Sequence, residues 1–355
     1  MNNASKKDEP SGNGPQRSVD HPTTMTWTIP IEITVSMPEV PVQVKVTSGK
    51  ASIAGAEGRF SSLPPDSGFG KFEIGSLSPN QFSWRTAFSM ALASKLAYES
   101  ETTVSEVTVN EWGFSDCRFI DVDDTQCFVV ESDKFVVLCF RGSENLGDWI
   151  ANLNMRSTTR GYGKVHRGFL GAFEVVKLEL QGLLRNLQGR PLLLAGHSLG
   201  GALATVAAAE WEGKFPISGI YTFGQPGVGK GEFPKFINQN YDGKFYRFVN
   251  DDDIVTRVPP TYRHVGKLFH FDSWGNLKNS SSRVSESANG AKEASETDMF
   301  SEVEFNLLRS ELHVKNAIAE GANVELPSAS LAEGLLPSIS DHRMDKYIEK
   351  IKRMV

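Results

Sequence analysis

Ser198 stands at the centre of a Gly-x-Ser-x-Gly pattern, with Gly196 and Gly200 two residues to either side. An apolar run, Leu192 to Ala195, precedes the pattern, and small residues from Gly201 to Glu210 follow it at helical spacing. A strand that turns sharply into a helix around a serine exposes the hydroxyl as a nucleophile. Glycines let the backbone pass close to itself at such a turn, and the amides that open the helix face a developing oxyanion. The stretch predicts a catalytic serine, and the alternative is a chance match in a loop.

A carboxylate partner for this serine is expected further along the chain. A serine hydroxyl needs a histidine base near neutral pH, and the imidazole needs a carboxylate that fixes its tautomer. The run Asp251 to Asp253 follows the expected strand Phe245 to Val249, and catalytic loops gather at such strand ends. Asp253 precedes the apolar pair Ile254-Val255, so it is the aspartate best placed to be buried. The alternative is that all three are solvated turn residues or helix caps.

The order of residues along the chain does not identify which histidine is the base. His166 precedes the serine, and His197 adjoins it on a strained turn and is expected to point away. Sequence order does not choose among the four histidines that remain downstream, and by default each is a structural or surface residue. These four are His264, His270, His313 and His342, the last of which opens the final expected helix.

The composition indicates a globular protein and argues against some classes of partner. The chain has 355 residues, of which 39% are hydrophobic and 23% charged. Its net charge of −6 gives no electrostatic argument for nucleic-acid binding, and no run reaches the length of a transmembrane helix. The first residues lack the apolar core of a secretory signal, which favours the cytoplasm or a non-classical route of export. Three cysteines at strand-like positions indicate buried thiols rather than disulfides or a metal site.

Three regions are expected along the chain. Residues 1–24 are polar and rich in Ser, Asn, Gly and Pro, which predicts a disordered tail. Residues 25–83 first alternate apolar and polar positions and are then rich in Gly, Ser and Pro, which predicts a β-hairpin extension and a linker. Residues 84–355 form the main domain, in which the segment from about 278 to 298 is a low-complexity insertion.

Strand and helix patterns alternate within the main domain. Strands are expected at Cys117 to Val122, Gln126 to Glu131, Lys134 to Phe140, Ile217 to Phe223 and Phe245 to Val249, besides the apolar run before Ser198. Helices are expected at Trp84 to Tyr98, Phe169 to Leu187, Phe300 to Ala319 and Asp341 to Val355. This order predicts an α/β fold with a mostly parallel central sheet and helices on both faces.

Several short motifs occur together in an order that resembles a known family. They are Ser94-Lys-Leu-Ala-Tyr98, Phe140-Arg-Gly-Ser143, Asp148-Trp-Ile-Ala-Asn-Leu153, Val165-His-Arg-Gly-Phe169, Gly196 to Gly201, Thr222-Phe-Gly-Gln-Pro226, Asn250 to Pro260 and Asp341-His342 to Tyr347. The set resembles the class 3 lipase family, the filamentous-fungal type of triacylglycerol lipase within the α/β-hydrolases, from about Phe88 to Tyr347. The resemblance implies an α/β-hydrolase fold, and the expected N-terminal hairpin lies outside it.

The resemblance also implies a set of site residues. The triad is Ser198, Asp253 and His342, in which the aspartate matches the one before Ile-Val and the histidine matches a late one that precedes a tyrosine. Ser143 matches the oxyanion residue after Arg-Gly, and Leu199 gives its backbone N–H beside the nucleophile. Both donors would face the developing oxyanion. No cofactor and no metal is implied.

The segment Glu144 to Asn152 falls where the family carries its lid. Leu146, Trp149 and Ile150 lie on one side of this segment at helical spacing. Such a helix can cover an apolar groove in water and can roll back at a lipid–water interface, where its apolar face meets the lipid. The alternative is an ordinary surface helix whose Trp packs inward, since amphipathic spacing does not distinguish the two.

The implied function is hydrolysis of acylglycerol esters through a Ser-His-Asp acyl-enzyme mechanism. The expected partners are a lipid or ester substrate at an interface and, transiently, a lipid surface. A phospholipase, a galactolipase or a short-chain carboxylesterase on the same scaffold stays open, because the sequence does not reveal the depth of the acyl pocket. A non-catalytic, lipase-like interaction protein is a further alternative. Secreted members usually have a signal peptide and disulfides, neither of which is expected here, and the chain also departs from the family in the insertion before His342.

Overall fold

The computed structural model describes residues 32–37, 40–47, 50–53, 69–75, 81–278, 299–319 and 339–355, the first three ranges as backbone alone. By its contacts the chain divides into two units, Met1–Ser61 and Ser62–Val355. The predicted tail at 1–24, much of the predicted linker and nearly all of the predicted insertion at 278–298 lie outside the described residues.

The first unit contains a small antiparallel sheet in the order β1-β2-β3. Its strands are β1 (Glu32–Met37), β2 (Val40–Thr47) and β3 (Lys50–Ile53). The pairing of β1 with β2, with Val35 opposite Val42, corresponds to the hairpin predicted from alternation. The third strand was not predicted, because four residues within a stretch assigned to the linker are too few to show a period.

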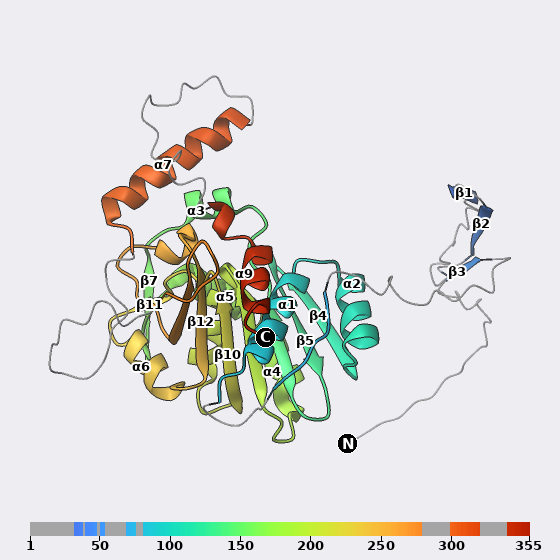
Figure 1. Cartoon of the computed structure of the whole chain (residues 1–355), viewed down its shortest axis with the longest axis horizontal. Coiled ribbons are helices and arrows are strands. Elements are labelled where there is room, and N and C mark those ends of the chain that lie inside the picture. Colours follow the sequence, from blue (N-terminus) through green and yellow to red (C-terminus); the bar gives the residue numbers. More distant parts are fainter. Residues whose placement is uncertain are drawn as a thin grey trace, which may run out of the picture. The chain divides into compact units, whose positions relative to one another are not determined.

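The second unit is built on a seven-stranded sheet in the order β13-β12-β10-β9-β6-β5-β4 (Figure 1). The strands are β4 (Asp116–Val122), β5 (Thr125–Glu131), β6 (Val136–Phe140), β9 (Leu192–His197), β10 (Ile217–Phe223), β12 (Phe245–Asn250) and β13 (Lys267–Phe271). Strands β6, β9, β10, β12 and β13 run parallel, and β5 and β4 continue the sheet antiparallel.

Helices cover both faces of this sheet. On β5, Cys127 and Val129 belong to one core cluster and Phe128 and Val130 to the other, as the twofold alternation of a strand requires. One cluster contains side chains of α4 (Arg167–Leu183) and α5 (Leu199–Trp211). The other contains side chains of α1 (Trp84–Leu96) and α9 (Met344–Lys352). The predicted fold class, a mostly parallel sheet with helices on both faces, is confirmed.

The remaining elements lie between these strands and helices. The helical ones are α2 (Glu101–Glu106), the π-helix η1 (Val107–Glu111), α3 (Leu146–Asn152), η2 (Leu184–Asn186), α6 (Phe233–Asn240), η3 (Ile254–Arg257) and α7 (Glu302–Ala319). A second small sheet, in the order β11-β8-β7, consists of β7 (Ser157–Arg160), β8 (Gly163–His166) and β11 (Gly229–Lys230). No described helix is long and apolar enough to cross a bilayer.

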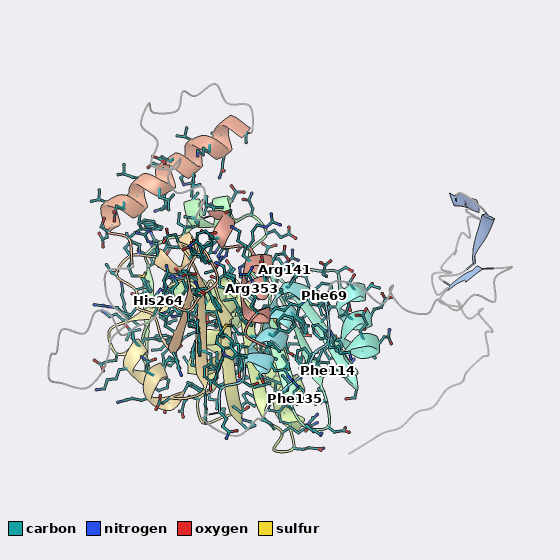
Figure 2. All side chains as sticks on the ribbon, viewed as in Figure 1. Phe69, Phe114, Phe135, Arg141, His264 and Arg353 are labelled. Carbon is teal, nitrogen blue, oxygen red and sulfur yellow. The ribbon has the colours of Figure 1, made fainter. Side chains whose placement is uncertain are left out.

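The carboxyl edge of the parallel strands is where the predicted site residues meet. Figure 2 shows Phe135, just before the first residue of β6, and Arg141, just after its last residue, at opposite ends of this strand. The segment with Ser143 follows β6, Ser198 follows β9, and Asp253 follows β12. Because parallel strands end at the same edge of a sheet, the topology brings these three loops together.

Candidate active site

Ser198 lies between the end of β9 and the first residue of α5, with a backbone φ of +59°. This conformation is rare for a residue with a side chain and is typical of strained functional turns. A Cβ on Gly196 would lie 2.3 Å from the carbonyl oxygen of Gly200, and one on Gly200 would lie 2.2 Å from that of Phe140. Close backbone approach therefore requires both glycines of the pattern.

Asp253 and His342 pair directly, although 89 positions separate them in the sequence. His342 Nδ1 lies 2.9 Å from Asp253 Oδ1 and 2.8 Å from Oδ2. Because an ionised carboxylate only accepts hydrogen bonds, Nδ1 carries the proton. In the neutral imidazole, Nε2 is then free to accept a proton from a nucleophile, which is the tautomer that a general base needs.

Asp253 is fully buried and is held as a carboxylate by several donors. Tyr347 Oη donates to Oδ2 at 2.6 Å, and the Val255 amide donates to Oδ1 at 2.9 Å. Burial by itself opposes ionisation, but the charge of His342 and the hydrogen bonds from His342, Tyr347 and Val255 outweigh it and lower the pKa of Asp253. The site thus contains a stable negative charge beside the candidate base.

The other three candidate histidines lie elsewhere. His264 Nε2 is 2.6 Å from the carbonyl oxygen of Thr256, and His270 Nε2 is 2.7 Å from that of Asp251. His313 is exposed on α7. The structure therefore brings His342, and not these three, to Asp253. Among the described residues no cluster of three or more His, Cys, Asp or Glu could hold a metal ion.

Ser198 Oγ and His342 Nε2 are both buried and make no hydrogen bond with the described residues. Ser198 is 1% exposed and His342 4%. Native structures leave few buried polar atoms unpaired, and a catalytic role is one explanation for such an atom. A nucleophile and its base often reach hydrogen-bonding distance only when substrate binds. These two unpaired atoms are the pair between which a proton would move.

The segment after β6 lies against Ser198. A Cβ on Gly142 would lie 3.0 Å from Ser198 Cβ and 2.6 Å from the His197 carbonyl oxygen. Ser143 follows directly, and Leu199 is the first residue of α5. The first amides of a helix have no intrahelical acceptor and carry partial positive charge. The two predicted oxyanion donors thus flank Ser198, one on each neighbouring segment.

The predicted lid segment forms the short helix α3, which Asn145 caps. Ile150 is fully buried, and Leu146 and Trp149 are half-buried and pack on the same core cluster. The Trp149 ring stacks on that of Phe169 with 6.3 Å between ring centres and 12° between planes. The apolar side of α3 therefore faces inward in this structure, which is the arrangement expected both of a closed lid and of an ordinary surface helix.

Three further hydrogen bonds were not predicted from the sequence. His197 was expected to point away, but its Nε2 lies 2.6 Å from the carbonyl oxygen of His342, and its Nδ1 lies 2.8 Å from Tyr98 Oη. Asn250 Nδ2 donates to the carbonyl oxygen of Asp341 at 2.7 Å. Tyr98 and Asn250 are parts of the motifs that carry the family resemblance, so the motifs were the available signal. The bond of Tyr98 to His197 and that of Asn250 to the His342 loop depend on the tertiary fold.

Comparison with known proteins gives one family and several relatives. Residues 137–263 match the family model described as Lipase (class 3). A secreted mono- and diacylglycerol lipase 1 of Fusarium solani is 39% identical over 151 residues, covering 39% of this chain and 44% of the relative. The triacylglycerol lipase OBL1 of Arabidopsis thaliana is 28% identical over 279 residues, covering 59% of this chain and 52% of the relative. A chloroplastic phospholipase A(1), DAD1, of the same plant is 32% identical over 150 residues, covering 35% of this chain and 33% of the relative.

The matched region contains the candidate nucleophile and the candidate acid. It starts within β6 and ends after η3, so it includes Ser143, Ser198 and Asp253 but stops before His342. The chain spans about half the length of the curated relatives that it matches.

Proposed function

Because this chain belongs to the class 3 lipase family of the α/β-hydrolases, we propose that it hydrolyses carboxylic esters of acylglycerols through an acyl-enzyme. The observation that carries the proposal is the direct pairing of His342 with Asp253 beside a serine held at positive φ. The unpaired Nε2 of that histidine and the unpaired Oγ of Ser198 complete the set of reacting groups.

In the acylation step, Ser198 Oγ attacks the ester carbonyl carbon while its proton moves to His342 Nε2. The carbonyl oxygen becomes an oxyanion, which accepts hydrogen bonds from the Leu199 amide and from Ser143. The tetrahedral intermediate then collapses, the ester C–O bond breaks, and His342 returns the proton to the departing alcohol. The product of this step is an acyl group on Ser198.

In the deacylation step, water takes the place of the alcohol. His342 accepts a proton from the water as its oxygen attacks the acyl carbon, and Ser198 leaves with that proton. Asp253 stays ionised throughout and stabilises the imidazolium that forms twice in each cycle. Because Asp253 is buried and its pKa is lowered, its charge is constant over the working range of pH.

The substrate class is inferred from the relatives and the lid segment. Two of the relatives are named as lipases of acylglycerols. The inward apolar side of α3 suits a lid that covers the site in water and turns toward lipid at an interface. We therefore place the reaction at a lipid–water interface. The relative named as a phospholipase A(1) supports a second candidate, an acyl hydrolase of phospholipids on the same machinery.

The first experiment compares wild type with Ser198→Ala on emulsified triacylglycerol, diacylglycerol and phosphatidylcholine and on a soluble butyrate ester. We expect wild type to cleave acylglycerols with a rise in rate above the solubility limit. Ser198→Ala should keep the wild-type circular dichroism spectrum and lose activity by roughly 10⁶-fold. Ser115→Ala, an exposed serine bonded to the Glu131 carbonyl, is the matched control and should keep full activity.

The substrate panel separates the candidates. A higher rate on phosphatidylcholine than on diacylglycerol would favour the phospholipase. A preference for the soluble ester, without any rise above the solubility limit, would contradict the interfacial lipase. Turnover retained in Ser198→Ala would overturn the nucleophile assignment, and wild-type protein inert to every ester would overturn the proposed function as a whole.

A further inference from the structure

A buried histidine bonds to the backbone of His342, and a half-buried tyrosine bonds to that histidine. His197, the last residue of β9, is 5% exposed, and its Nε2 is 2.6 Å from the carbonyl oxygen of His342. Tyr98 follows α1, and its hydroxyl is 2.8 Å from His197 Nδ1. Neither residue takes part in the proton transfers proposed above. The question is what this pair contributes to the site.

The chemistry of the three groups fixes the direction of both hydrogen bonds. A backbone carbonyl oxygen only accepts hydrogen bonds. His197 Nε2 therefore carries a proton and donates a hydrogen bond to the carbonyl oxygen of His342. Burial, together with the nearby His342, lowers the pKa of His197 to about 3, so the ring is neutral and Nδ1 has a free lone pair. Tyr98 therefore donates its O–H to Nδ1. The chain of donors runs from Tyr98 through His197 to the backbone of His342.

His197 contacts both the backbone and the ring of His342. The His197 and His342 rings lie 4.3 Å apart between centres at 30°, so the base rests on the neighbouring imidazole. The adjacent carbonyl, that of Asp341, accepts from Asn250 Nδ2 at 2.7 Å. Nδ1 of His342 is hydrogen-bonded to Asp253. The other ring nitrogen, Nε2, is therefore the one that can approach Ser198.

The same tyrosine also lies against the predicted oxyanion segment. A Cβ on Gly142 would be 2.1 Å from Tyr98 Oη, so the hydroxyl lies directly against the backbone that precedes Ser143. The guanidinium of Arg141 lies over the Tyr98 ring, 5.6 Å from its centre. Tyr98 thus contacts the oxyanion side of the site, while its hydrogen-bond partner contacts the base side.

We propose that Tyr98 and His197 are positioning residues, which fix the His342 backbone so that its Nε2 meets Ser198 Oγ. This inference rests on the proposed function, because it assigns a role within that reaction. The competing explanation is that the pair satisfies buried polar groups and stabilises the fold without affecting the reaction. The two explanations differ in what happens to turnover per correctly folded molecule.

The experiment compares His197→Gln with His197→Met. A glutamine amide can reach the His342 carbonyl oxygen and donate to it, whereas methionine has similar length and no donor. Active sites are counted with a serine-directed phosphonate, and kcat, KM and the pH profile of kcat/KM are measured on a soluble ester. We expect His197→Met to lose up to roughly 100-fold in kcat per titrated site, because a small displacement of a base is costly, with little change in KM.

The accompanying variants calibrate this loss. His197→Gln should recover most of the rate, and Tyr98→Phe should lose less than His197→Met because the donor to His342 remains. The pH profile of His197→Met should shift along its acid limb, since the surroundings of the base have changed. His264→Met is the control, because His264 Nε2 also meets a backbone carbonyl at 2.6 Å but lies well away from Arg141 in Figure 2. It should lose stability and keep the wild-type pH profile.

A measurement without turnover keeps this test independent of the proposed function. The Nδ1 proton of His342, bound to Asp253, should give a downfield resonance in wild type and in His197→Gln that shifts or disappears in His197→Met. An unmoved resonance in His197→Met would overturn the proposal even if wild type were inert to esters. Equal kcat per titrated site in wild type and His197→Met, or equal losses in the Gln and Met variants, would overturn it as well.

Discussion

At the scale of single residues, Asp253 is where the hydrogen bonds of the site converge. Its carboxylate accepts from the His342 ring, the Tyr347 hydroxyl and the Val255 amide. Tyr347 is itself fully buried, and its oxygen accepts from the Asn250 amide at 3.1 Å. An aspartate in this position can accept from every neighbour, whereas an asparagine must present N–H groups to one of these donors.

We therefore expect Asp253→Asn and Tyr347→Phe to differ in size and in kind. Asp253→Asn should lower kcat by about 10⁴-fold, because His342 is released from the tautomer that a base requires. Tyr347→Phe removes one donor to the carboxylate and should lower kcat by roughly tenfold or less. Steady-state kinetics on one soluble ester measures both. More than a tenth of wild-type kcat in Asp253→Asn would contradict the acid assignment.

The turn around Ser198 could be predicted from the sequence, but the pairing of Asp253 with a histidine far along the chain could not. The turn around Ser198 was predictable because its glycines are required by backbone contacts within a few residues or with one neighbouring strand. The choice of His342 over His264 or His270 was not available from spacing, because 89 residues separate it from Asp253. The family resemblance supplied that choice. No residue pattern predicted that His197 would turn toward the base.

At the scale of elements, the short helix α3 is packed against the longer helix α7. Arg309 Nε donates to the carbonyl oxygen of Ala151 at 2.9 Å, and Asn316 Nδ2 donates to the Asp148 carboxylate. Phe305, Leu308 and Leu312 of α7 are buried in the core cluster that contains Ile150. If α3 is the lid, its displacement must break these contacts with α7.

Asn316→Ala should then ease opening of the lid. Losing one hydrogen bond to a carboxylate weakens the closed state by about 1 kcal/mol, which corresponds to an increase of about fivefold in the open fraction. The rate on a soluble ester below its solubility limit should rise by up to that factor, and the rate on an emulsion should change little. Asn240→Ala on α6, where the amide bonds to a carbonyl of its own helix, is the control. Equal ratios of the two rates in all three proteins would show that this contact does not restrain a lid.

Elements were predictable where their own period was long enough. The strands β4, β5, β6, β9, β10 and β12 and the helices α1, α4 and α7 follow from apolar spacing that extends over several residues, whereas the edge strand β13 was not predicted. The strand β3 and the π-helix η1 were not predicted, because four and five residues show no distinctive period. The contact of α7 with α3 could not be predicted either, since its Arg309–Ala151 bond joins residues 158 positions apart through a side chain that is ordinary on a helix surface.

At the scale of the whole molecule, three histidines are buried or largely buried and serve as donors to backbone carbonyls. The Nε2 atoms of His166, His197 and His264 each lie 2.6 Å from a carbonyl oxygen. Burial is the largest cause that lowers the pKa of all three, to about 3 for His197 and His264. His197 joins segments 145 positions apart in the sequence, whereas the bonds of His166 and His264 span 12 and 8 positions.

Acid should therefore destabilise the protein well above the pH at which its carboxylates titrate. The unfolded chain binds a proton at each histidine below about pH 6.5, while the folded chain keeps His197 and His264 neutral. The unfolded state then binds more protons than the folded state. The free energy of unfolding therefore has its highest value above about pH 6.5 and falls as the pH is lowered. The lowered pKa of Asp253 acts only below about pH 4, where its contribution is lost as the pH falls further.

From pH 7 to pH 5 we expect a loss of roughly 4 kcal/mol from His197 and His264 together, measured by urea unfolding at the two values. His264→Gln keeps an N–H donor for the Thr256 carbonyl but cannot titrate, so it should lose about half as much stability over this interval. His313→Gln, at an exposed position on α7, should behave as wild type. A wild type equally stable at both pH values would contradict the prediction, because two neutral buried histidines cannot be reconciled with a flat profile.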